Sequence, residues 1–119
     1  VKWAVAGRRR RKRRLRQAKG YRGARRLHLR KAKETVMRAK AYRTRDRKVK
    51  KREFRNLWVI RLNAAARARG LKYGQLIASL RKAQVRLDRK QLAELAINDA
   101  AAFDQLVATA GEQSIVHSP

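Results

Sequence analysis

The sequence predicts an all-α protein built from an extended basic N-terminal tail, a long basic helix and a small globular C-terminal helical domain. Three observations predict this fold class. No stretch alternates apolar and polar residues in the manner of a half-buried strand. Residues 24–69 contain no glycine or proline, the two residues that most often interrupt a helix. After residue 70, apolar residues recur at the spacing of amphipathic helices.

The charge of the chain indicates a polyanionic partner. Its 119 residues carry a formal net charge of +27, a self-repulsion that favours such a partner. Residues 1–58 hold 26 Lys or Arg against 3 Asp or Glu, a net of +23, and residues 59–119 hold 9 against 5, a net of +4. No apolar run approaches the roughly 18 residues of a membrane span, so a membrane is not an expected partner. The absence of cysteine excludes disulfides and fits a cytoplasmic protein.

Residues 1–23 are predicted to form the basic tail. Arg8–Arg14 is a run of seven cations, with little apolar surface nearby to offset the entropy of ordering. We therefore expect the tail to be disordered alone and extended along phosphates when bound. A nonspecific solubilising tail and a nuclear-targeting run are the alternative interpretations. Within Gly20–Gly23, Tyr21 is suited to stack on a base and Arg22 to reach phosphate, although a simple hinge fits the same pattern.

Residues 24–58 are predicted to form a long basic helical arm. A weak apolar stripe recurs at helical spacing: Leu29, Ala32, Val36 and Ala39. Between Arg43 and Arg55 many like charges lie four residues apart, and each such pair costs roughly a few tenths of a kcal/mol. We expect this section to complete its helix only when a polyanion neutralises it. A kink near residues 42–46 is compatible with the pattern.

Residues 59–111 are predicted to fold as the globular domain, with residues 112–119 as a flexible tail. The end of the long helix carries an apolar face towards this domain: Phe54, Leu57, Trp58, Leu62 and Ala65. Gly70 is expected to end that helix in a left-handed turn. The expected core anchors are Trp58, Leu62, Leu76, Leu80, Leu95, Phe103 and Leu106.

Three shorter helices are expected after the long one. They span about residues 73–84, 89–97 and 100–110. Asp88 precedes the second, with Gln91 three residues further on, which is the spacing of a capping box. Asn98 or Asp99 is expected to cap the third, and Gly111 to end it.

Catalysis is poorly supported. The two histidines, His28 and His117, lie far apart in the sequence, and the carboxylates form no helical metal-binding pattern. No phosphate-binding loop or dinucleotide motif is present. We therefore expect no catalytic residue, no metal site, no cofactor and no enzyme activity. Asp46 and Glu53 lie among cations and are expected to be their ion-pair partners.

Several uncommon blocks of residues occur in order: KGYRGAR at 19–25, RDR at 45–47, FRNLW at 54–58, RLNAAAR at 61–67, Gly70 and LDRK at 87–90. With these blocks the chain resembles, from about residue 8 to 110, the family of the twentieth protein of the bacterial large ribosomal subunit. The resemblance implies a tail and long helix buried in large-subunit (23S-type) rRNA, and a helical domain at the surface beside neighbouring large-subunit proteins. It also implies an early role in subunit assembly, in a cytoplasmic or plastid ribosome. In some bacteria the domain also represses translation by binding the leader of its own messenger.

Charge and resemblance together predict the residues that contact rRNA. Arginine outnumbers lysine here, and it makes forked contacts with phosphate and stacks on bases. The primary set is Arg8, Arg9, Arg10, Arg11, Lys12, Arg13, Arg14, Lys19, Tyr21, Arg22, Arg25, Arg26, Arg45, Arg47, Lys50, Lys51, Arg52 and Arg55. The secondary RNA surface is Arg61, Arg67, Arg69, Arg86, Arg89 and Lys90.

Other functions also fit the charge. A DNA-binding architectural protein would bind duplex DNA at least as well as RNA. A translational repressor would bind a specific messenger through residues 59–119 alone. A membrane-active cationic helix fits less well, because residues 43–53 lack an apolar face.

Overall fold

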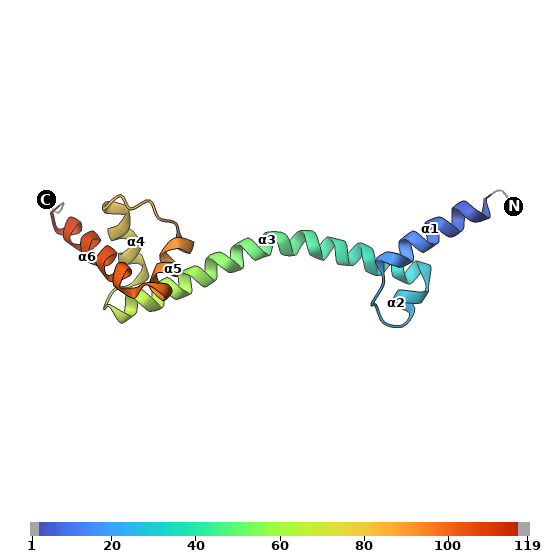
Figure 1. Cartoon of the computed structure of the whole chain (residues 1–119), viewed down its shortest axis with the longest axis horizontal. Helices are drawn as coiled ribbons and strands as arrows, with labels where there is room; N and C mark the ends of the chain where they lie inside the picture. The colour runs from blue at the N-terminus through green and yellow to red at the C-terminus, as the bar shows by residue number, and fades with distance from the viewer. Residues whose placement is uncertain (1–2, 117–119) are drawn as a thin grey trace. The chain divides into compact units, whose positions relative to one another are not determined.

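The computed structural model describes residues 3–116, and the side chains of residues 3–111. This part of the chain is helical with no strand, which confirms the all-α prediction (Figure 1). The helices are α1 (Ala4–Gln17), α2 (Ala24–Leu27), α3 (Leu29–Ala68), α4 (Tyr73–Lys82), α5 (Arg89–Asn98) and α6 (Ala100–Val116). The chain divides into two compact units, an N-terminal unit, Val1–Val49, and a C-terminal unit, Lys50–Pro119. No described helix combines the length and the apolar character needed to cross a membrane.

The N-terminal segment differs from the sequence prediction. It was expected to be extended, yet the 14 residues of α1 are helical. Most of these residues are Arg, Lys, Ala, Leu or Gln, which have high helix propensity. The arginines of the cationic run are exposed, so their long side chains spread into water and each repulsive pair costs only roughly a few tenths of a kcal/mol.

Two glycines shape the connection between α1 and α2. Gly20 has a φ of +87°, and Gly23, which precedes α2, has a φ of +61°. Both values lie in a region that glycine adopts without the steric cost of a side chain. His28 is extended, with φ −93° and ψ 122°, and it separates α2 from α3.

A small apolar cluster holds the N-terminal unit together. Ala18, Ala32 and Val36 are buried, and Leu15 and Tyr21 pack partly against them. Ala32 and Val36 belong to the weak stripe seen in the sequence. The cluster therefore joins the end of α1 to the first turns of α3.

Helix α3 is uninterrupted over 40 residues, and His28 separates it from α2. Its last turns contribute Leu62 and Ala66 to the core of the C-terminal unit. Phe54 and Leu57 were expected on the same apolar face, but both are exposed. The part of α3 that packs against the core of the C-terminal unit therefore begins near Trp58. As expected, Gly70, with a φ of +75°, follows the end of the helix.

The C-terminal unit has a single core to which four helices contribute. Its buried residues are Leu62, Ala66, Leu76, Leu80, Leu92, Ala93, Phe103 and Ala110. Helix α6 contacts both α4 and α5. Of the seven expected anchors, four are buried, and the other three are partly buried against this core: Trp58, Leu95 and Leu106.

The predicted caps are present. Asp88 accepts a hydrogen bond from the Gln91 backbone, and the Gln91 side chain accepts one from the Asp88 backbone. Asp99 accepts one from the Ala102 backbone at the start of α6. The expected end of this helix at Gly111 is wrong, since α6 continues to Val116. A glycine inside a helix costs only about 1 kcal/mol, and no proline follows before residue 119.

Candidate nucleic-acid interface

Helix α1 presents a dense positive surface. Eight of its 14 residues are Lys or Arg and none is acidic. All eight are exposed, including the whole of Arg8–Arg14. Only Arg14 and Arg16 lie in the last turn, where the helix dipole favours cations. The other six cations of α1 have neither an acidic residue on the helix nor the negative end of the helix dipole beside them.

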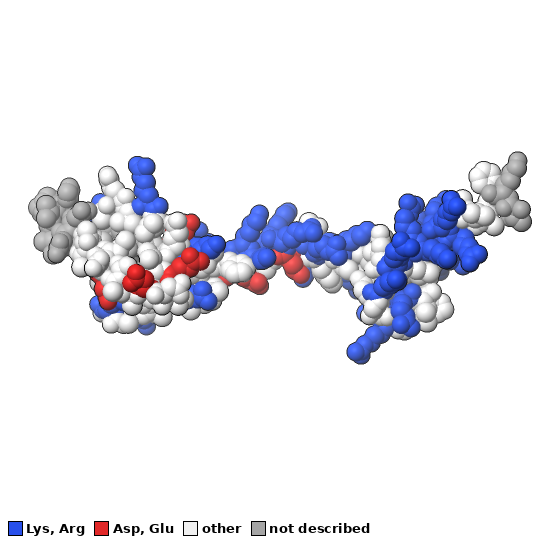
Figure 2. Space-filling view, viewed as in Figure 1, with Lys and Arg blue, Asp and Glu red and all other residues white. Residues whose placement is uncertain are grey.

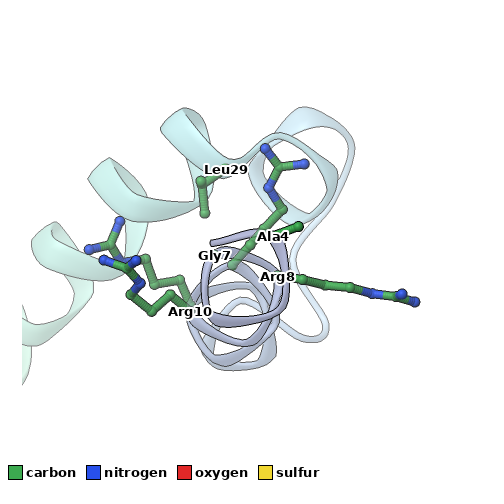
Figure 3. Close-up of a pocket in the computed structure, with 7 residues that line it drawn as sticks. Ala4, Gly7, Arg8, Arg10 and Leu29 are labelled. Carbon is green, nitrogen blue, oxygen red and sulfur yellow. The ribbon is translucent and has the colours of Figure 1, made fainter. Parts of the chain in front are cut away.

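A shallow hollow lies between α1 and the start of α3. Ala4 and Gly7 of α1 and Leu29 of α3 provide small or apolar lining, as Figure 3 shows. The remaining lining residues are arginines: Arg8, Arg10, Arg11 and Arg14. Arg8 and Arg10 point to different sides of α1 (Figure 3). Such a lining combines an apolar floor with guanidinium groups that can bind phosphate.

The glycine turn carries further predicted RNA contacts. Tyr21 is half-buried against the N-terminal cluster, so only part of its ring is open to a base. Arg22 and Arg25 are exposed and line a second hollow together with Gly20, Tyr21 and Thr35. Lys19 and Arg26 are also exposed.

Helix α3 carries the remaining primary set on exposed positions: Arg45, Arg47, Lys50, Lys51, Arg52 and Arg55. Arg45 is partly engaged by the protein. Its Nε donates a 2.9 Å hydrogen bond to Asp46 Oδ1, and its guanidinium lies 4.6 Å from the centre of the Tyr42 ring. This hydrogen bond and the negative charge of Asp46 raise the pKa of Arg45 above its ordinary value. The prediction that Asp46 is an ion-pair partner is confirmed, with Arg45 as the partner.

Two residues of the secondary RNA surface, Arg69 and Arg89, form hydrogen bonds within the C-terminal unit. Arg69 donates a hydrogen bond to Asp104 and another, 2.9 Å long, to the Ala65 carbonyl, and it lies 4.8 Å from the centre of the Phe103 ring. Arg89 Nε donates a 2.9 Å hydrogen bond to the Tyr73 hydroxyl. The other four are exposed: Arg61, Arg67, Arg86 and Lys90.

Charge differs sharply between the two units. Val1–Val49 holds 22 Lys or Arg and 2 Asp or Glu, whereas Lys50–Pro119 holds 13 and 6. On the face drawn in Figure 2, Lys and Arg atoms cover much of the N-terminal unit, and several Asp and Glu side chains lie on the C-terminal unit. Within the described residues, no group of three or more His, Asp or Glu side chains could hold a metal ion.

The family model of ribosomal protein L20 matches residues 1–106. The chain belongs to the ribosomal protein L20 family. It is therefore a structural protein of the large ribosomal subunit that binds rRNA and is located in the ribosome among other ribosomal proteins. The family is structural and not enzymatic. The contact roles of individual residues stay predictions.

Proposed function

We propose that α1, the glycine turn and the basic part of α3 bind large-subunit rRNA and fix rRNA helices relative to one another early in subunit assembly. The observation that carries this proposal is the exposed, unbalanced charge of α1, eight cations without an acidic residue. A surface of this kind gains most from a densely phosphorylated partner, because each neutralised phosphate releases a bound counterion.

Binding and local folding are coupled in this proposal. The N-terminal cluster buries only Ala18, Ala32 and Val36, so it offers little apolar area against the repulsion of the cations. When phosphates neutralise the cations, the repulsion between them falls. The stabilisation from burial of the same cluster is then opposed by less repulsion. The bound rRNA then orders α1, as expected for a basic segment that folds on binding.

The test is a salt series of binding to large-subunit rRNA fragments, with duplex DNA and transfer RNA as competitors. If about ten cations meet phosphates, the logarithm of affinity should fall with the logarithm of salt with a slope of about −7 to −9. Tight binding to one fragment that survives both competitors supports the proposal. Equal loss to every competitor contradicts it, and a preference for duplex DNA favours the architectural alternative.

A matched pair of variants assigns the contact to α1. Replacing all seven residues of Arg8–Arg14 with glutamine should reduce the steepness of the salt slope by about 5–6, at roughly 0.7–0.9 per phosphate contact. The control replaces three exposed cations of the secondary surface with glutamine: Arg67, Arg86 and Lys90. The α1 variant should also delay subunit assembly when added to a reconstitution with the other components, while circular dichroism still reports a folded C-terminal unit. Equal effects of the two variants on slope and assembly contradict the assignment.

We also propose that the C-terminal unit represses translation by binding the leader of its own messenger. Four exposed cations of this unit support a second RNA surface: Arg61, Arg67, Arg86 and Lys90. The three-glutamine variant of the full chain, at Arg67, Arg86 and Lys90, should lose affinity for the leader while keeping most of its affinity for the rRNA fragment. Equal retention of leader binding contradicts this second role.

A further inference from the structure

An exposed stripe on α3 is not explained by the core. Lys50, Phe54, Leu57 and Arg61 recur at i, i+4, i+7 and i+11, so they share one face of the helix. All four are exposed, with Phe54 at 45% and Leu57 at 37% of their surface. The stripe therefore places two apolar side chains between two cations.

The Phe54 ring has protein neighbours on the same helix at both ends. Lys50 Nζ lies 5.8 Å from the ring centre, which is within the range of a cation–π contact. The centre of the Trp58 ring lies 6.2 Å away, with the two rings tilted by 39°. Trp58 is in turn partly buried against the core of the C-terminal unit. The exposed Phe54 ring is thus oriented by a partner that the core supports.

The apolar and cationic side chains of the stripe indicate which kind of molecule can bind there. A surface that covers Phe54 and Leu57 must present an apolar face, and next to Lys50 and Arg61 it must also carry negative charge. An unpaired nucleotide meets both conditions, because its base has a flat π-face and its phosphates are anionic. A duplex meets only the second, since its bases are stacked on each other.

We propose that Phe54 is a stacking platform for an unpaired base of the bound RNA, with Lys50 and Arg61 contacting flanking phosphates and Leu57 extending the apolar surface. Lys50 and Arg61 are eleven residues apart, about 16 Å along the helix axis, which leaves room for a short unpaired segment. This inference rests on the proposed function, since it assumes that the chain binds RNA.

The test uses the full chain and three probes of equal length: a single-stranded oligoadenylate, an abasic strand with the same number of phosphates, and an RNA duplex. Phe54→Leu removes the ring and keeps an apolar side chain that is compatible with a helix, whereas Phe54→Tyr keeps a ring. Ile60→Leu is the control, because Ile60 is also exposed on α3 but lies outside the stripe. Circular dichroism checks that every variant is folded.

Phe54→Leu should weaken binding of the oligoadenylate by roughly tenfold. Its affinity for the abasic strand and the duplex should be unchanged, and the other two variants should bind all probes like the original chain. An equal loss for all three probes, or no loss for the oligoadenylate, overturns the platform, and the second result leaves an acidic protein surface as the occupant. Failure of the proposed function is distinguishable, because the original chain would then show no preference for an rRNA fragment.

Discussion

The two units of this chain are stabilised to different degrees by burial and opposed to different degrees by charge. Among the side chains of residues 3–111, the N-terminal unit buries three that are apolar, two of them alanines, and the C-terminal unit buries eight, including Phe103. The net charges of the two units are +20 and +7. The contrast indicates that the first unit depends on a polyanion for its stability, whereas the second folds mainly through its own core.

The largest predicted effect is on the core of the C-terminal unit. Phe103→Ala removes a fully buried ring and should destabilise the unit by about 3–5 kcal/mol. This is much of the total stability of a small domain, so α4, α5 and α6 should unfold together in a denaturant titration. The control Ile97→Ala changes a side chain that is 58% exposed and should shift stability by no more than about 0.5 kcal/mol. Similar shifts for both variants would contradict the assigned core.

A smaller effect is predicted for the N-terminal cluster. Val36→Ala removes two buried carbon groups and should cost about 1.5–2 kcal/mol, at roughly 0.8 kcal/mol for each. Amide hydrogen exchange should then become faster in α1 and the first turns of α3. The thermal transition of the C-terminal unit should stay in place. A shift of that transition by a comparable amount would show that the two units do not fold separately.

The internal role of Arg69 gives the third prediction. Arg69→Met removes the contacts with Asp104, the Ala65 carbonyl and the Phe103 ring and should destabilise the C-terminal unit by about 1–2 kcal/mol. Its affinity for an rRNA fragment should change less than twofold. Arg67→Met serves as comparison, because Arg67 is exposed and only bonds Asn63 on its own helix. A large loss of rRNA affinity in Arg69→Met without loss of stability would contradict this internal role and indicate that Arg69 contacts RNA.

The smallest effect is predicted at the start of α5. Asp88→Ala removes the side chain that accepts a hydrogen bond from Gln91 and should cost about 1 kcal/mol. Glu94→Ala is the matched control on the same helix, since Glu94 is exposed and lies away from the cap. In chemical denaturation, the C-terminal unit should be less stable with Asp88→Ala than with Glu94→Ala. Equal stability of the two variants would contradict a stabilising role of the capping box.

Local signals in the sequence predicted much of this fold. The capping box at Asp88 and Gln91 and the left-handed Gly70 depend on neighbouring residues, so spacing alone identifies them. Val36 and Ala32 likewise followed from helical periodicity. These features required no knowledge of distant contacts.

Other features depended on a balance of energies or on tertiary contacts. Charge repulsion predicts an extended tail, but the helix propensity of arginine outweighs this repulsion in α1. The contact between Arg69 and Asp104 joins residues 35 apart, and no local pattern predicts such a pair. The exposure of Phe54 also required the structure, because its spacing places it on the same helix face as Leu62, which is fully buried.

Amide hydrogen exchange of the full chain, alone and bound to a large-subunit rRNA fragment, tests the central contrast most directly. We predict that α1 amides exchange much faster than those of α4 and α5 in the free chain and become protected in the complex. The amides of α4 and α5 should be protected in both states. Strong protection of α1 in the free chain, equal to that of α4 and α5, would contradict the claim that the N-terminal unit depends on its polyanionic partner.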